Sequence, residues 1–196
     1  MVEADSLLKK PNSDKYRLDR RQFLKIGTMA FISSLCPIPA LAFPDSSLFP
    51  DRRLSFFNTH TGEYLDVDYC IKGRYCPDGL SAIDHILRDY RTEDIYRMDP
   101  KLLDLLFNIS NKLDISEPFH VISGYRSPAT NALLCRNSRG VAKNSFHIKG
   151  QAVDIRLPGL HLSKLKKMAM KMKAGGVGYY PRSDFVHLDI GPVRYW

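Results

Sequence analysis

Three residues in the last third of the chain have the types and settings of metal ligands: His147, Asp154 and His187. Asp154 lies inside a run, 152–157, that alternates as a strand, and a carboxylate there is costly to bury unless it is paired or bound to a metal. His187 lies in a second apolar run, 185–190. If these two strands are antiparallel neighbours, Asp154 and His187 point from one face, and His147 joins them from the preceding loop.

Two imidazoles and one carboxylate form a donor set that suits Zn²⁺. Three protein ligands leave a fourth position for water, which is the arrangement of a catalytic site rather than a closed structural site. Zinc lowers the pKa of that water to about 7 and polarises a carbonyl group, so the set predicts hydrolysis of an amide. The alternative is that these His and Asp side chains are structural and form hydrogen bonds. Two His and one Asp at such spacing often occur in a sequence by chance, so the spacing alone does not exclude this alternative.

The spacing of apolar residues predicts the elements that must position these side chains. A hairpin is expected from the β-rich runs 54–59 and 64–69. Helices are expected at four stretches of helical periodicity, with Asp99 capping the second: 80–90, 100–113, 128–136 and 162–173. Further strands are expected at 119–122, 152–157, 177–180 and 185–190. Because helices come mainly first and strands later, the predicted fold class is α+β.

Residues 1–42 have the pattern of a twin-arginine export signal. Arg20-Arg21 precedes Phe23-Leu24-Lys25 and a mildly apolar stretch, which closes with the small-x-small pattern Ala40-Leu41-Ala42. The alternatives are a short membrane anchor or a buried helix, against which the prolines of the segment argue. We therefore expect a signal peptide, 1–42, and one working domain, 43–196. The domain would be exported folded by the twin-arginine machinery to the periplasm or cell envelope, with no stable membrane span after cleavage.

The composition is that of a globular protein with a basic balance. The chain has 196 residues, 29 Lys and Arg against 21 Asp and Glu, and a net charge of +8. Residues 1–42 hold seven of the basic and four of the acidic residues, which leaves +5 for residues 43–196. An anionic polymer is therefore a plausible partner, whereas no nucleic-acid motif accompanies the charge. Cys70 and Cys76 are close enough in sequence for a disulfide bond, which is left open.

Several segments around the three candidate ligands resemble one peptidase family. The segments are Ser145-x-His147-x-x-Gly150-x-Ala152-x-Asp154, Ser123–Ser127, 175–181 and 191–196. Together with His187 they resemble the zinc D,D-peptidase family, and most closely its exported branch typified by murein endopeptidase K. The resemblance implies that His147, Asp154 and His187 bind one Zn²⁺ ion. It also implies an α+β fold in which helices pack on a small antiparallel sheet that carries the zinc site.

The resemblance extends to residues around the metal. It implies that Arg126 stabilises the reacting carbonyl, since a guanidinium near zinc can bind an oxyanion with paired hydrogen bonds; the alternative is a loop Arg in a surface ion pair. Ser145 and Gln151, with Tyr125, are assigned to substrate binding, where Ser145 and Gln151 hold the ligand loop and shape the cleft. Ser145 could equally be a turn residue.

The general base is where this sequence departs from the family pattern. Some branches place a Glu three positions before the last ligand and others a His two before it, whereas this chain has Asp184 and Phe185 there. Asp184 is the first candidate for the base. Asp189 is the second, or it orients a ligating His as an outer carboxylate. A third alternative is that neither residue is the base.

The leading hypothesis is a zinc metallopeptidase that cuts amide bonds in peptidoglycan peptide cross-links during growth or remodelling of the cell wall. One alternative is a D,D-carboxypeptidase or dipeptidase that acts on free stem peptides. Another is a non-catalytic domain that binds the wall and keeps a structural zinc. The expected partners are peptidoglycan and the export machinery, with no nucleic acid, and the protein is expected to be a monomer.

Overall fold

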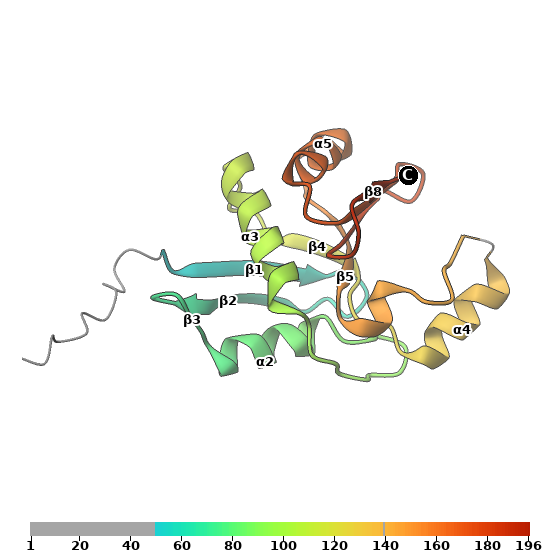
Figure 1. Ribbon diagram of the computed structural model, residues 1–196. Coiled ribbons are helices and arrows are strands. Elements are labelled where there is room, and N and C mark those ends of the chain that lie inside the picture. Colours follow the sequence, from blue (N-terminus) through green and yellow to red (C-terminus); the bar gives the residue numbers. More distant parts are fainter. Residues whose placement is uncertain (1–49, 139) are drawn as a thin grey trace, which may run out of the picture. The chain divides into compact units, whose positions relative to one another are not determined.

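The computed structural model describes residues 50–138 and 140–196. The signal peptide predicted for residues 1–42 and its cleavage after Ala42 lie outside the described residues. The strands are β1 (Arg52–Asn58), β2 (Tyr64–Ile71), β3 (Arg74–Tyr75), β4 (Phe119–Ser123), β5 (Ala152–Arg156), β6 (Gly176–Tyr180), β7 (Phe185–Asp189) and β8 (Arg194–Tyr195) (Figure 1). The helices are α2 (Pro77–Ile86), α3 (Pro100–Leu113), α4 (Pro128–Asn137) and α5 (Leu162–Met172), and a 3-10 helix, η2 (Phe146–Lys149), precedes β5.

Within the described residues, the strands form one sheet in the order β3-β2-β1-β4-β5-β7-β6-β8. Most neighbours are antiparallel, but β1 with β4 and β6 with β8 are parallel. The predicted α+β class is confirmed, whereas the sheet is mixed where an antiparallel sheet was expected. β4 can run parallel to β1 because β2, α2 and α3 lie between them, and a parallel pair needs such a long connection.

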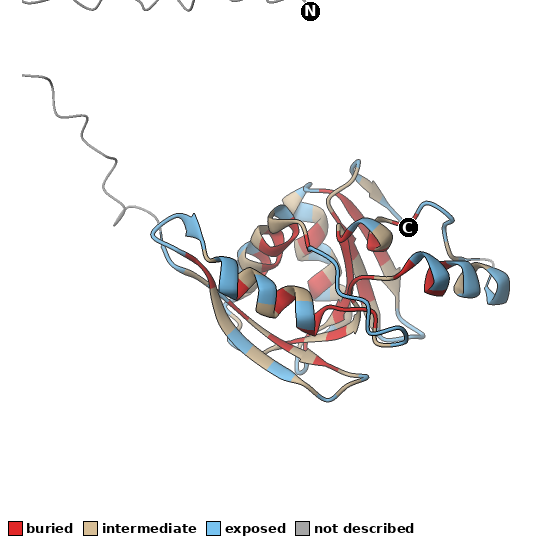
Figure 2. Ribbon diagram, turned by 90° about the horizontal axis from the view of Figure 1, so that it is seen from below, coloured by how far each residue is buried: buried red, intermediate tan, exposed pale blue. Residues whose placement is uncertain are grey.

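Helix α3 begins where the sequence predicts it. The Asp99 carboxylate accepts a hydrogen bond from the Lys101 amide at 3.0 Å, and Pro100 occupies the first helical position. The buried side of the helix consists of Leu102, Leu103, Leu105, Leu106 and Ile109. This side packs against β1 and α5, while α5 also packs against β6 and β7, so both helices cover one face of the sheet (Figure 1). Figure 2 shows the buried stretches along the central strands and the helices that pack on them.

The helix predicted at 80–90 is displaced toward the N-terminus. It begins at Pro77 and ends at Ile86. The Leu87 carbonyl accepts a hydrogen bond from the Tyr125 amide at 2.7 Å, so the chain after Ile86 joins the segment that follows β4. This contact attaches the loop that carries Arg126 to the end of α2.

The two strands that carry Asp154 and His187 are antiparallel neighbours, as predicted. In the register of β5 and β7, Asp154 lies directly opposite His187. The alternate residues Val153, Ile155 and Val186 are completely buried in the core. Because side chains alternate between the two faces of a sheet, the polar pair lies on the face away from these core residues.

The loop that carries His147 is fixed at both of its ends. The Ser145 hydroxyl accepts a hydrogen bond from the His147 amide at 3.3 Å and so caps η2. Gly150 ends η2 with a φ of +64°, and a Cβ atom there would lie 2.2 Å from the Arg97 carbonyl oxygen. The Gly150 carbonyl accepts a hydrogen bond from the Asp99 amide at 2.9 Å. The ligand loop therefore rests against the start of α3, and only glycine fits at this contact.

No helix in the described part of the chain is both long and apolar enough to cross a membrane. The described cysteines, Cys70, Cys76 and Cys135, are free thiols, so the bridge left open for the first two is not formed in this structure. Cys70 is buried and accepts a hydrogen bond from Arg52 at 3.0 Å.

Candidate metal centre

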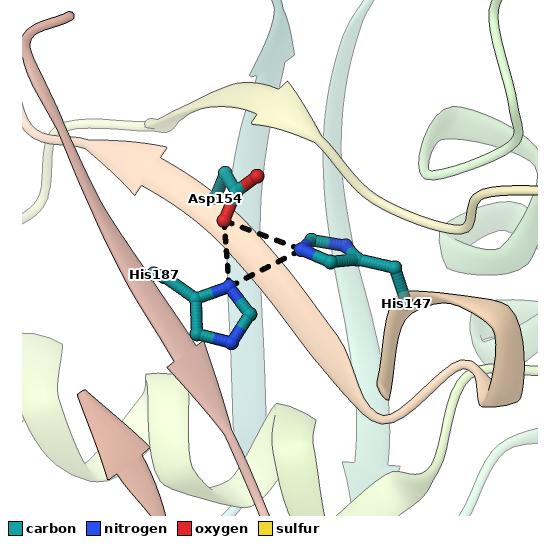
Figure 3. Close-up of side chains that lie close together, drawn as sticks. All are labelled: His147, Asp154 and His187. Carbon is teal, nitrogen blue, oxygen red and sulfur yellow. Dashed lines mark hydrogen bonds and ion pairs between the residues drawn. The ribbon is translucent and has the colours of Figure 1, made fainter. Parts of the chain in front are cut away.

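His147, Asp154 and His187 come from η2, β5 and β7 and turn their polar atoms toward one another (Figure 3). His147 Nε2 lies 3.2 Å from His187 Nδ1 and 3.3 Å from Asp154 Oδ1. The remaining pair, His187 Nδ1 and Asp154 Oδ1, is 2.8 Å apart. His147 and Asp154 are buried, and the His187 side chain is 12% exposed. One face of the sheet therefore carries three candidate ligand atoms around a common point.

In each imidazole, the nitrogen that points away from the other two side chains (the outer nitrogen) donates a hydrogen bond to an acceptor. His147 Nδ1–H donates to the Gly124 carbonyl at 2.7 Å, and His187 Nε2–H donates to Asp189 Oδ2 at 3.0 Å. Metal-binding histidines almost always donate their second N–H to a carbonyl or carboxylate in this way. In their neutral forms, both rings therefore direct a lone pair toward Asp154 Oδ1.

These distances fit a tetrahedral metal ion. Bonds of about 2.0 to 2.1 Å place the ligand atoms of such an ion about 3.3 Å apart. Two of the three separations, 3.2 and 3.3 Å, match that spacing, and the third, 2.8 Å, is shorter. Lone pairs and a carboxylate this close repel one another unless a cation or a proton lies between them. His147, Asp154 and His187 could thus hold a metal ion with little rearrangement.

Burial is the largest influence on the ionisation of all three side chains. It lowers the pKa of His147, because the charged imidazolium loses its water. Burial would raise the pKa of Asp154, but His147 and His187 outweigh it and hold that pKa below its usual range. Burial would lower the pKa of His187, but the carboxylates of Asp154 and Asp189 together raise it to about 9. A metal ion that binds here at neutral pH would therefore displace a proton from His187.

Arg126 lies beside the second oxygen of the aspartate. Its Nη2 is 3.5 Å from Asp154 Oδ2 and 3.4 Å from the Ser123 hydroxyl. The side chain is 11% exposed, and its Nε–H has no hydrogen-bond partner among the described residues. Burial lowers the pKa of Arg126, although Asp154 opposes that shift. The Nε–H is therefore a buried donor, and Nη2 is the nitrogen that lies beside Asp154.

The three residues and Arg126 line one cleft of about 380 Å³. Its lining also includes residues of the loop between α4 and η2 and of β6, β7 and β8. We call His147, Asp154 and His187 the triad. The other aromatic and basic residues that line the cleft are Arg126, Phe146, Tyr180, Phe185, Arg194 and Trp196. Among the described residues that line this cleft, Asp154 is the only acid.

A family model described as peptidoglycan L,D-endopeptidase MepK matches residues 47–196. The chain belongs to this family. Among curated proteins, the peptidoglycan L,D-endopeptidase MepK of Escherichia coli strain K12 is 44% identical over 183 residues, which cover 93% of this chain and 100% of that protein. The probable peptidoglycan L,D-endopeptidase MepK of Haemophilus influenzae is 42% identical over 179 residues, which cover 91% of this chain and 95% of that protein. The predicted resemblance to the murein endopeptidase K branch is confirmed.

Ser145 and Gln151 hold the ligand loop of this MepK-family chain, but only Ser145 lines the cleft. Ser145 is buried and caps η2, which agrees with its interpretation as a turn residue. Gln151 Nε2 donates to Asp99 Oδ2 at 3.2 Å, on the side of the loop that faces α3. The predicted role of Gln151 in substrate binding therefore has no geometric support, whereas its role in holding the loop does.

Tyr125 lies outside the cleft. Its side chain is 8% exposed, and its ring stacks on Tyr96 with 4.8 Å between ring centroids. Tyr125 belongs to the hydrophobic core, whereas the adjacent Arg126 lines the cleft. The structure brings Arg126 to the triad and places Tyr125 in the core, which leaves its predicted contact with substrate without support.

Asp184 is likewise turned away from the triad. It adopts a left-handed backbone conformation, with a φ of +53°, at the turn before β7. Its side chain is 62% exposed and forms an ion pair with Arg156 at 2.9 Å. It lines a separate depression with His120 and Leu157 instead of the cleft. The role of general base predicted for Asp184 therefore has no geometric support in this structure.

Asp189 lies behind His187, on the side of the imidazole that faces away from Asp154 and His147. It is completely buried, and its oxygens accept hydrogen bonds from His187 Nε2, from the amides of Gly176 and Gly191, and from Arg194. This network lowers the pKa of Asp189 to about 2, even though burial opposes the shift. A carboxylate bonded in this way orients His187 and has no oxygen free to take a proton from water. Of the two roles considered for it, the geometry supports orientation of the ligand.

The wall of the cleft formed by Tyr180, Arg194 and Trp196 was not among the predicted site residues. Arg194 belongs to β8, a strand of two residues that no periodicity could indicate. The available signal was the segment 191–196, which contributes to the family resemblance and contains the only tryptophan of the sequence.

Proposed function

We propose that this protein is a zinc-dependent endopeptidase that hydrolyses L,D amide bonds in the peptide cross-links of peptidoglycan. The observation that carries the proposal is the triad. Two imidazoles, each oriented by an outer acceptor, and one carboxylate meet at the spacing of tetrahedral ligands in the wall of a cleft. The names of the family and of its curated relatives support the substrate class.

In this proposal His147, Asp154 and His187 bind one zinc ion. When bound, zinc would lower the pKa of a coordinated water to about 7 and act as a Lewis acid toward a carbonyl oxygen. Gly124 and Asp189 keep the two imidazoles in the tautomers that bind metal. The low pKa of Asp154 keeps the third ligand ionised.

Arg126 supplies the charge that the reaction needs beside the metal. Attack on an amide carbonyl places negative charge on its oxygen, and a preorganised donor in a site that excludes water stabilises that charge strongly. Arg126 lines the cleft, which places its guanidinium beside the triad. Its contact with Asp154 Oδ2 holds the guanidinium next to the ligand cluster. We assign Arg126 to binding of the carbonyl oxygen and of the oxyanion that forms from it.

We further propose that the protein acts in the periplasm or cell envelope as a monomer, after export of the folded chain by the twin-arginine machinery. The twin arginines, the moderate apolar stretch and the small-residue cleavage pattern of residues 1–42 support this route. Expression with Arg20 and Arg21 both replaced by lysine tests it. Retention of the uncleaved protein in the cytoplasm is expected, and normal export of that variant would disprove it.

Muropeptide analysis tests the activity. Purified, zinc-loaded protein is incubated with isolated murein sacculi, with the His187→Ala variant as the matched control. We expect L,D cross-linked dimers to disappear and new monomers to form only with the unaltered protein. Release of D-alanine with the dimers intact would instead identify a carboxypeptidase. No new muropeptides from folded, zinc-loaded protein would overturn the proposal and leave the wall-binding alternative.

A further inference from the structure

The cleft contains an aromatic side chain that the proposed catalytic groups do not use. Trp196 follows β8 and is held to β6 by backbone hydrogen bonds, from its amide to the Val177 carbonyl at 3.2 Å and from the Tyr179 amide to its own carbonyl at 2.9 Å. These bonds continue the parallel pairing of β8 with β6. The backbone of Trp196 is therefore part of the sheet, and its side chain has a defined position.

The indole of Trp196 is seated on the strand next to His187. Its Nε1–H donates to the Tyr180 hydroxyl at 2.7 Å. A Cβ atom at Gly178 would lie 2.7 Å from the indole, so the ring rests directly on this glycine. Gly178 is the partner of His187 in the register of β6 and β7. This seat brings the indole to 5.4 Å from the His187 ring, measured between centroids.

The neighbours of the indole hold it in place and leave part of it open. The Arg194 guanidinium lies 5.0 Å from the Trp196 ring centroid, and its charge is paired with Asp189. Phe185 stacks on Tyr180 with 4.6 Å between centroids and supports the hydroxyl that binds the indole. Even so, Trp196 remains 48% exposed and lines the cleft. A large apolar surface fixed in advance in a cleft binds an apolar group at little entropic cost.

We propose that Trp196 is a substrate-binding residue, whose indole receives the aliphatic side chain of the peptide residue next to the scissile bond. The inference rests on the proposed function, because the triad defines where the scissile carbonyl lies. At 5.4 Å from a ligand ring, the indole can contact only a group close to that carbonyl. The contact is apolar because the Trp196 N–H is already bonded to Tyr180 and the nearby charge of Arg194 is paired.

Steady-state kinetics on soluble cross-linked muropeptides tests the contact. Loss of an apolar contact of this size corresponds to about 10-fold to 100-fold in kcat/KM. We expect Trp196→Ala to show this loss mainly as a higher KM, with zinc content unchanged. Trp196→Phe should recover part of it. The matched control is Tyr195→Ala, which changes the exposed aromatic residue just before Trp196, a residue that does not line the cleft.

A second variant displaces the indole without removing it. Gly178→Ala places a methyl group where the ring rests, so it should reduce kcat/KM to a similar extent. Unchanged kcat/KM in Trp196→Ala would overturn the inference. A loss that zinc content fully explains would overturn it as well, because Trp196 would then act only on the ligand His187.

Fluorescence provides a test that does not depend on cleavage. Trp196 is the only tryptophan in the sequence, so the tryptophan emission of this protein comes from the cleft wall alone. On rapid mixing of zinc-loaded protein with soluble cross-linked muropeptides, we expect a saturable change in emission before turnover. A change in emission without cleavage would refute the proposed function and would leave Trp196 as a contact for bound muropeptide, with no scissile bond to place it. Cleavage without any change in emission would refute the inference and keep the proposed function.

Discussion

Asp154 and Asp189 are two buried carboxylates on opposite sides of the His187 ring, and their surroundings differ. Asp189 accepts hydrogen bonds from backbone amides at 2.8 and 3.0 Å, from Arg194 at 2.7 Å and from the outer nitrogen of His187. Asp154 faces the inner nitrogens of His147 and His187, and its nearest guanidinium nitrogen, on Arg126, is 3.5 Å away. The first carboxylate is satisfied by the protein, whereas the second is surrounded by other potential metal ligands.

This difference separates a positioning group from a binding group. A buried carboxylate saturated by N–H donors stabilises its neighbourhood and fixes the geometry of the ring that it contacts. A buried carboxylate that faces two imidazole nitrogens at this distance needs a metal ion or a proton between them. Substitutions at the two aspartates should therefore affect different properties of the protein.

Asp154→Asn is expected to have the largest effect on activity. It removes the charge of the proposed zinc ligand, and losing about 4 kcal/mol of transition-state stabilisation lowers the rate about 10³-fold. Metal analysis of the purified variant should show loss of zinc, and muropeptide cleavage should fall accordingly. Retention of both zinc and activity would show that Asp154 is a structural residue.

Arg126→Ala is expected to lower kcat about 10²-fold to 10³-fold, as for removal of one oxyanion donor. Zinc content should remain unchanged, because the guanidinium touches Asp154 only through its second oxygen. Arg126→Lys, which keeps the charge but not the planar fork, should recover a small part of the rate. An unaltered kcat in the alanine variant would reduce Arg126 to a partner of Asp154.

Asp189→Asn is expected to act on stability and on zinc affinity together. An asparagine cannot satisfy all the donors around this position, which costs about 2 kcal/mol in the free energy of unfolding. Loss of the acceptor for His187 should weaken zinc binding about 10-fold to 100-fold. Chemical denaturation and a competitive zinc titration measure the two effects. A variant that lost activity at saturating zinc with normal stability would indicate a direct role in proton transfer.

Asp184→Asn is expected to have the smallest effect, with kcat/KM within about twofold of the unaltered protein, because exposed ion pairs contribute little. The residue is exposed, pairs with Arg156 and does not line the cleft. A large loss of turnover with zinc retained would restore Asp184 as the base and would require the turn before β7 to move.

The triad could be predicted from the sequence because Asp154 and His187 are polar residues within apolar strands. Asp154 stands inside an apolar strand, where alternation places it opposite His187, and a pattern of period two is sufficient to find this arrangement. The N-cap of α3 at Asp99 was predictable for a similar reason, since the signal is local.

The rest of the site depended on geometry that local patterns do not contain. Asp184 lies three positions before His187, but its left-handed conformation turns the side chain toward Arg156. Trp196 reaches His187 through the pairing of β8 with β6, in which the chain returns past β7 to the far side of β6. The mixed order of the sheet was missed for the same reason, since parallel pairing depends on long connections.

Asp99 links the metal site to the helical layer. The residue caps α3 through Lys101, donates its amide to Gly150 and accepts from Gln151, so one side chain and its backbone join the helix start to the loop of His147. Local opening of either segment therefore has to break bonds of the other, and the two should exchange their amide hydrogens as one cooperative unit. Zinc loading should slow hydrogen exchange in the first turn of α3, although no residue of that helix is a predicted ligand.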